Sequence, residues 1–341
     1  MIDLLVAGGG PAGLATAINA ARAGLEVVVA EPRRTPVDKA CGEGLMPSAV
    51  RALAGLGVDV DGHPFRGIRY VDARHQAEGH FRGHPGKGVR RTELHAALSR
   101  RAADLGVTVL PLRVTGVRQN GDSVTAAGVT ARYLAAADGL HSPIRRGLGI
   151  AVADRRPGHR APRYGLRRHF AVPPWSDCVE VHWSARSEAY VTPVGPGLVG
   201  VAVLSCDRAS FGEQLARFPQ LADRLPRSAA TAVRGAGPLR QRVRTRVSGR
   251  VLLVGDAAGY TDALTGEGIS LAIGAAAELV RCLRAGRPQD YDRAWRRVSR
   301  QYRVLTGTLL WLREHPRLGA RIVPTAARFP AAFTAAVNRL A

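Results

Sequence analysis

The chain is poor in cysteine, and the few cysteines lie far apart in the sequence. Cys41, Cys178, Cys206 and Cys282 form no CxxC pair and have no histidine at ligand spacing. This pattern argues against a disulfide framework and against a zinc site, and it fits a reducing compartment. We therefore expect a cytoplasmic protein in which no metal is implied.

Lysine is nearly absent. Of 49 basic residues only Lys39 and Lys87 are lysines, and the net charge is +22. The arginines are scattered, without a recognisable nucleic-acid module or interleaved stacking aromatics, so a nucleic-acid partner is not expected. Attraction to an acidic partner, a phosphorylated cofactor or an anionic lipid surface is compatible with this charge.

Long apolar runs are also missing. Residues 4 to 21 carry no charge, but the glycines and proline of GGGPAG interrupt them, which predicts a strand, a turn and a helix rather than a membrane span. The first residues lack the basic head of a signal peptide. The last fifty residues are arginine-rich and helical in pattern, and they either pack as terminal helices or lie on a membrane surface.

The opening residues predict a βαβ unit. IDLLVA is a continuous apolar strand, residues 11 to 23 form a helix, and LEVVVA is a second strand closed by Glu31. Gly8, Gly10 and Gly13 form the GxGxxG turn between strand and helix, which lets a pyrophosphate approach the helix N-terminus. An acid at position 31 accepts hydrogen bonds from ribose hydroxyls, which favours FAD or NAD over NADP.

Two further motifs follow apolar strands. VGDAAGYTDALTGEGIS places Gly255 and Asp256 after a buried strand, and AADGLHSPIRRGLG contains Asp138, Gly139 and Arg145. The first resembles the GD motif of two-dinucleotide-domain flavoproteins, and the second resembles the DG motif of flavin-dependent aromatic hydroxylases. Together with GxGxxG, they resemble the FAD-dependent superfamily of class A flavoprotein monooxygenases, flavin halogenases and geranylgeranyl-reductase-like enzymes.

This resemblance implies an α/β fold. The expected architecture is a Rossmann-like FAD-binding domain (GR2/PHBH-like) that is interrupted by a β-sheet substrate domain and followed by C-terminal helices. The expected segments are 1–65, 87–155 and 240–287 for the FAD-binding domain, 66–86 and 156–239 for the substrate domain, and 288–341 for the helices.

The tripeptide Gly-Glu-Gly occurs twice, at 42–44 and 266–268. Within the resemblance, Gly266, Gly268 and Ile269 start a helix whose N–H groups face the flavin. The earlier turn would lie in a loop that passes close to the same ring, with Lys39 near its start. Arg91 matches an arginine that relatives place near the flavin. These residues, with those of the three motifs, are the predicted cofactor-binding set.

Cys41, Glu43 and Tyr190 are the candidate catalytic residues. Cys41 either fills space near the ring, protonates or positions the substrate, or forms a covalent link to the flavin. Glu43 is either solvated or paired with an arginine. Tyr190, on a predicted strand, either lines the substrate pocket or belongs to the core of the sheet.

Two reactions fit the motifs. The first is an NAD(P)H-using monooxygenase that hydroxylates an aromatic or polyketide-type small molecule in a biosynthetic pathway, with NADPH or NADH as a transient reductant. The alternative is an ene reductase of the geranylgeranyl-reductase type that saturates an isoprenoid or polyketide double bond. The DG motif ranks the monooxygenase first, whereas CGEG and TGEGI resemble the reductases. The presence of both Glu31 and Asp256 argues against a fold that only binds nucleotide or a partner.

Overall fold

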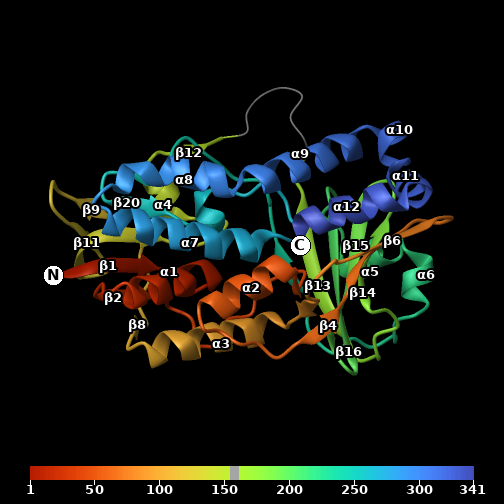
Figure 1. Ribbon diagram of the computed structural model, residues 1–341, viewed down its shortest axis with the longest axis horizontal. Helices are drawn as coiled ribbons and strands as arrows, with labels where there is room; N and C mark the ends of the chain where they lie inside the picture. The colour runs from red at the N-terminus through yellow and green to blue at the C-terminus, as the bar shows by residue number, and fades with distance from the viewer. Residues whose placement is uncertain (154–160) are drawn as a thin grey trace.

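The computed structural model describes residues 1–153 and 161–341. Figure 1 shows two sheets side by side, with the N-terminal segments around one and residues from the middle of the chain in the other. The predicted domain boundary at 155/156 lies outside the described residues.

The first sheet is built from strands that are apolar on both faces. Leu4, Leu5 and Val6 of β1 are fully buried, as expected when helices cover both sides of a parallel sheet. The predicted βαβ unit is confirmed, because β1 pairs parallel with β2 and α1 connects them. The parallel strands, in spatial order, are β20 (Val251–Leu253), β11 (Val129–Ala136), β1 (Ile2–Ala7), β2 (Val27–Ala30) and β8 (Thr108–Leu110).

Short antiparallel strands extend this sheet, and helices cover it. α1 contacts both α3 and α7, so residues from three distant parts of the sequence surround the central strands. The added strands are β9 (Arg118–Gln119), β10 (Val124–Ala126) and β19 (Val247–Ser248), and the helices are α1 (Pro11–Arg22), α3 (Arg91–Asp104), α4 (Pro143–Gly147), the 3-10 turn η1 (Gly255–Ala258) and α7 (Gly268–Arg284).

The second sheet combines residues 67–80 with residues 164–236. The predicted hairpin near 66–82 is confirmed as β5 and β6, and β5 pairs parallel with β14. The order is β17 (Arg234–Ala236), β13 (Tyr164–Phe170), β16 (Leu198–Ser205), β15 (Ser187–Gly195), β14 (Cys178–Trp183), β5 (Gly67–Val71) and β6 (Gln76–His80). Helices α5 (Phe211–Leu215) and α6 (Pro219–Ala222) lie beyond β16 in the chain.

A small sheet joins the two large ones. A Cβ added to Gly88 would lie 1.6 Å from the carbonyl oxygen of Pro193 on β15, so only glycine permits this approach of the two backbones. The strands of the junction are β3 (Gly44–Leu45), β4 (His63–Phe65) and β7 (Gly86–Gly88), with α2 (Pro47–Gly55) beside them, and β12 (Ala151–Val152) pairs with β18 (Arg242–Val243).

The C-terminal segment is helical, and it covers both sheets. α8 packs on α7, α11 and α12 pack on β6, and α9 runs between them along the top of the molecule in Figure 1. Among the described residues, no helix combines the length and the apolar character that a membrane span requires. These elements are η2 (Pro288–Asp290), α8 (Tyr291–Val298), α9 (Arg300–Glu314), α10 (Pro316–Gly319), α11 (Ile322–Arg328) and α12 (Pro330–Leu340).

Candidate functional site

The GxGxxG turn has the close contacts that exclude side chains. A Cβ on Gly13 would lie 1.8 Å from the oxygen of Gly8, and Gly8 itself has φ +110°. Gly10 begins α1 with no side-chain cap on the helix. The N-terminal N–H groups of α1 are therefore available for an anion, and the backbone is open to its approach.

Glu31 lies at the end of β2, directly beside this turn. Its Oε2 accepts a hydrogen bond from the N–H of Gly9 at 2.8 Å, and both of its oxygens accept from Arg33. Burial raises the pKa of Glu31, but the hydrogen bonds from Arg33 and Gly9 outweigh it and hold the pKa below its usual range. Glu31 is thus an ionised acceptor, and ribose hydroxyls would share it with Arg33.

The DG and GD motifs are joined by one buried arginine. Arg145 Nη1 donates to the carbonyl oxygens of Asp256 (3.2 Å) and Ala257 (3.0 Å), and its Nη2 donates to Leu140 (2.8 Å) and Gln241 (2.6 Å). Arg145 is not among the residues that line the cavity described below. Its observed contacts assign it to fixing the two motifs relative to each other.

Asp138, the acid of the DG motif, does line the cavity. Its Oδ2 accepts from the N–H of Ile144 at 3.1 Å, and its buried Oδ1 has no partner among the described residues. Burial raises the pKa of Asp138 above its usual range. Gly139 follows with φ +86°, so the chain turns away immediately after the acid.

Three charged groups converge on the cleft between the motifs. Asp256 forms an ion pair with Lys39 Nζ at 3.1 Å, which brings the loop before the first Gly-Glu-Gly turn to the GD motif. Arg91 begins α3, and its buried Nη1 has no hydrogen-bond partner in residues 1–153 and 161–341. An ideal Cβ on Gly10 would lie 4.0 Å from Arg91 Nη2, so this guanidinium faces the glycine turn.

The second Gly-Glu-Gly turn precedes α7. Gly266 (φ +72°), Gly268 and Ile269 all line the cavity, and α7 begins at Gly268 as predicted. Burial raises the pKa of the intervening Glu267 to about 7, and its Oε2 has no partner among the described residues. Gly255, with φ +64°, completes this part of the cavity lining.

The first Gly-Glu-Gly turn is fixed by its carboxylate. Glu43 has φ +60° and is buried. Its Oε1 accepts from the N–H of Arg91 at 2.8 Å, and its Oε2 accepts from His169 Nε2 on β13 at 2.6 Å. Arg167 Nη2 lies 3.7 Å from Oε1 and also bonds Asp38. Glu43 therefore links the loop, α3 and the second sheet.

Cys41 faces the cavity at the tip of this loop. Its Sγ accepts a weak hydrogen bond from the N–H of Glu43 at 3.4 Å, and Thr192 on β15 donates to the carbonyl oxygen of Gly42 at 2.8 Å. Burial raises the pKa of the Cys41 thiol, although Arg91 opposes this effect. The thiol is consequently protonated at neutral pH.

A cavity of about 460 Å³ connects these groups with the second sheet. Tyr190 lines it, but its hydroxyl donates to the carbonyl oxygen of Leu264 at 2.9 Å, so this tyrosine holds the segment before the second turn. Burial raises the pKa of Tyr190 well above its usual value. Apolar side chains from β4, β5, β14 and α12 form the wall opposite the motifs: Phe65, Ile68, Val179, Val181, Val337 and Leu340.

The chemistry of these donors fits FAD. The resemblance predicts Arg91 near the flavin, but its guanidinium faces the glycine turn, so Arg91 and the N-terminus of α1 would face the pyrophosphate. Glu31 would face the adenosine ribose, and Asp256 the ribitol. Nη1 of Arg91 and Oδ1 of Asp138 are buried and have no partner in the described part of the chain, and such a ligand can satisfy both atoms. Within the described residues, the three motifs share one cleft.

His169, Arg167 and His95 were missed by the sequence analysis. His169 and Arg167 lie on β13, more than a hundred residues from the loop that they hold. His95 Nε2 bonds the carbonyl oxygen of Gly9 at 2.9 Å and so braces the glycine turn. The position of His95 four residues after Arg91, on one face of α3, was the available signal. No local pattern marked the other two.

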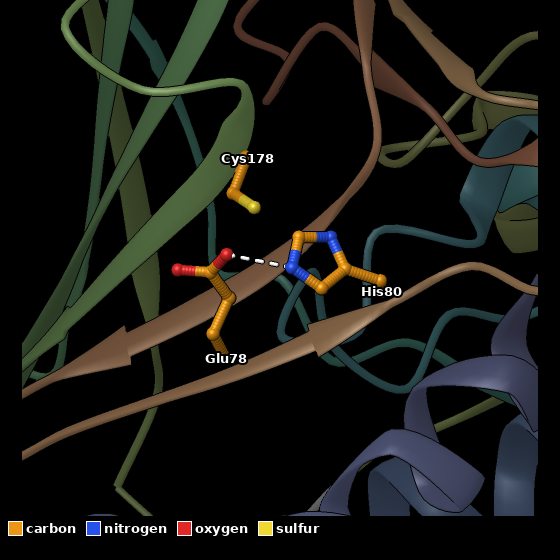
Figure 2. A group of neighbouring side chains, drawn as sticks. All are labelled: Glu78, His80 and Cys178. Atoms are coloured by element: carbon orange, nitrogen blue, oxygen red, sulfur yellow. Dashed lines mark ion pairs between the residues drawn. The ribbon is translucent and has the colours of Figure 1, made fainter.

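A group of potential metal ligands lies on the second sheet. The ligand atoms of Glu78, His80 and Cys178 are within 4.8 Å of one another, and Figure 2 shows the Glu78–His80 ion pair beside the thiol. Arg69 already binds the other oxygen of Glu78 at 2.7 Å. Burial, together with Glu78, raises the pKa of Cys178 to about 12. We assign no metal to this group.

Comparison with known proteins agrees with the motifs. The model of the FAD binding domain family matches residues 1–199. Menaquinone reductase of Mycobacterium tuberculosis is 32% identical over 309 residues, which cover 78% of this chain and 72% of that protein. Chloroplastic geranylgeranyl diphosphate reductase of Oryza sativa is 29% identical over 308 residues, covering 80% and 64%.

Solved structures show the same fold. A flavoprotein/dehydrogenase from Cytophaga hutchinsonii superposes with a TM-score of 0.76 at 18% identity, covering 98% of this chain and 96% of that one. The family model matches this chain from its first residue. The same chain contains the glycine turn, the acid after β2 and the motifs after β11 and β20. The chain belongs to the FAD binding domain family and is a member of the superfamily of FAD-dependent oxidoreductases.

Proposed function

We propose that this protein is an FAD-dependent reductase that saturates a carbon–carbon double bond of an apolar isoprenoid or polyketide-type substrate. A nicotinamide donor, NADPH or NADH, would bind transiently and reduce the flavin. The sequence motifs ranked the monooxygenase first and the ene reductase second, and this proposal reverses that ranking.

The observation that carries the proposal is the position of the Cys41 thiol in a cavity that has an apolar wall. Cys41 lines the same cavity as Ile68, Val179 and Leu340, and burial raises the pKa of its thiol. Saturation of a double bond needs a hydride at one carbon and a proton at the other. When bound and reduced by the nicotinamide donor, the flavin would supply the hydride. Cys41 Sγ holds the proton at the cavity surface.

The residues around Cys41 fix its position. Glu43 and Thr192 hold the loop on both sides of the thiol, through the contacts to Arg91 and to the Gly42 carbonyl. The apolar wall excludes water from the substrate carbons, which protects the proton transfer from exchange with solvent. The two relatives reported above support a reductase, because their names describe the reduction of menaquinone and of geranylgeranyl diphosphate.

The proposal is tested by separating flavin reduction from product formation. Protein loaded with FAD is mixed anaerobically with NADPH or NADH and a polyprenylated quinone or geranylgeranyl lipid. We expect a product that is heavier by two hydrogens. Cys41→Ala should lower product formation by about 10², while the rate of flavin reduction stays unchanged. Product formation at the original rate by Cys41→Ala would remove Cys41 from the reaction.

A monooxygenase is the second candidate, because Asp138, Ser142 and Arg145 match the DG motif of the hydroxylases. Oxygen distinguishes the two reactions. A monooxygenase forms no product when oxygen is excluded, and its product gains an oxygen atom. Such a result would replace the reductase assignment with the second candidate.

A further inference from the structure

The C-terminal helices carry large apolar side chains that point to solvent. Val304 and Trp311 on α9, Leu318 on α10 and Phe329 between α11 and α12 are 60%, 48%, 36% and 55% exposed. They are half of the exposed large apolar residues in the described chain. Concentration in one segment distinguishes them from the singly scattered apolar residues of ordinary surfaces.

The exposed apolar residues of α9 lie on one face of the helix. Val304 and Trp311 are seven residues apart and therefore lie on one face of the helix. The opposite face is buried through Tyr302, Thr306 and Leu310. The ring of Trp311 contacts the ring of His315 in a tilted arrangement, with the ring centroids 4.5 Å apart. α9 thus has a packed inner face and a second, outward apolar stripe that none of the described residues covers.

Arginines accompany these apolar residues. Residues 300–341 contain seven arginines and a single acidic residue, Glu314. Arg317 and Arg321 are exposed, and neither forms an ion pair with any of the described residues. Arg328 lies over the ring of Phe329, with its Cζ 5.9 Å from the ring centroid. The segment presents positive charge together with aromatic and aliphatic surface.

We propose that this surface, formed by Val304, Trp311, Leu318 and Phe329 with Arg317 and Arg321, docks on an anionic lipid bilayer. The apolar side chains enter the boundary of the acyl chains, and the arginines bind lipid phosphates. Tryptophan is suited to this depth because its ring is apolar and its N–H is polar. Arg317 and Arg321, which form no ion pair with a described residue, favour an anionic bilayer over a second copy of this strongly basic chain.

The same segment reaches the cavity. Val337 and Leu340 of α12 line it, and Phe333 packs against Tyr70 of the cavity wall, with the ring centroids 4.8 Å apart. Figure 1 shows α9 to α12 as a continuous outer layer over the second sheet. Docking would therefore hold the apolar side of the cavity near the bilayer. It does not depend on which reaction the cavity performs.

The test uses the FAD-loaded protein and vesicles. We expect co-sedimentation with vesicles that contain phosphatidylglycerol, weaker binding to pure phosphatidylcholine, and release by high salt. Arg317→Gln/Arg321→Gln should lower the affinity about tenfold or more. Trp311→Ser/Phe329→Ser should lower it similarly. Brominated lipids should quench tryptophan fluorescence in the native protein and not in Trp311→Phe.

Matched controls lie in the first sheet region. Val109→Ser/Leu112→Ser removes exposed apolar residues there, and Arg113→Gln/Arg118→Gln removes exposed arginines. Both control variants should bind vesicles as the native protein does. Three results would each overturn the proposal. The control variants could weaken vesicle binding as much as the test variants do, or the native protein could fail to sediment with anionic vesicles. The third result is a dimer without lipid that buries Trp311.

Discussion

The two Gly-Glu-Gly turns have the same three residues, but they differ in backbone conformation and in the hydrogen bonds of the glutamate. At 42–44, the glutamate itself takes the left-handed conformation, and both of its oxygens accept hydrogen bonds. At 266–268, the glycine before the glutamate takes that conformation. Burial raises the pKa of Glu267 to about 7, and one of its oxygens has no partner in the described chain. The surroundings of each carboxylate, rather than the tripeptide, decide its role.

This difference assigns separate tasks to the two turns. Glu43 is a structural anchor, because it joins the loop of Cys41 to α3 and to β13. Glu267 is a titratable group at the N-terminus of α7, where it can exchange a proton near neutral pH. Paired substitutions at the two positions test the contrast directly.

The largest expected effect comes from replacing the anchored carboxylate. Glu43→Gln keeps the shape of the side chain but leaves His169 and Arg167 facing a neutral group. We expect the free energy of unfolding to fall by about 3 kcal/mol, since removing one member of a buried charged network leaves the others uncompensated. Urea denaturation at pH 7.5 measures this change.

The matched variant is Glu267→Gln under the same conditions. It removes a carboxylate that is buried without full compensation, so its stability should equal or exceed that of the native protein. Equal losses in the two variants would abolish the distinction between the turns.

The next effect is a dependence on pH. The pKa of Glu267 rises from an ordinary 4.5 to about 7 on folding. The native state therefore binds more protons than the unfolded chain between these values. The resulting stabilisation is complete below pH 4.5 and is lost as pH rises through 7. After allowance for solvent screening, we expect about 1–2 kcal/mol.

The stability difference between the native protein and Glu267→Gln isolates this contribution from that of other groups. Urea titrations at several pH values from 4.5 to 8 should show the difference changing in favour of the variant as pH rises. A difference that is constant with pH would place the pKa of Glu267 at its ordinary value.

The smallest effect concerns the backbone. Gly266→Ala puts a side chain at φ +72°, which should cost about 1 kcal/mol, although the space around this glycine is open. Gly42→Ala, in the other turn, has open space and no left-handed angle, so it should change stability by less than about 0.5 kcal/mol. Thermal denaturation of both variants compares them. An equal loss for Gly42→Ala would show that the two turns share one backbone requirement, and a larger loss would contradict the expected order.

The sequence was most informative where function depends on neighbouring residues. The glycine turn before α1, the acid after β2 and the motifs after β11 and β20 each combine a short pattern with a predicted strand or helix, so their positions followed from the chain itself. The start of α7 and the hairpin of β5 and β6 were predicted for the same reason.

The partners of Glu43 could not be predicted from the sequence, because they come from another sheet. Whether His169 faces the loop depends on the register of β13 and on how the two sheets meet, and neither is encoded locally. The Glu78, His80 and Cys178 group has the same origin, since Cys178 pairs with Gly67 and Gly67 pairs with His80 across three strands. Gly67, which has no side chain, lies between Cys178 and His80, so the side chains of Glu78, His80 and Cys178 can approach one another.

The hydrogen bonds from Arg145 to the carbonyl oxygens of Asp256 and Ala257 have a practical consequence for mutagenesis. A substitution at position 145 would release the loop of Asp256 and Ala257 from its support. We therefore expect the purified variant to bind less FAD. Loss of FAD from such a variant would not by itself identify Arg145 as a ligand of the coenzyme, because this arginine also supports the backbone of the site.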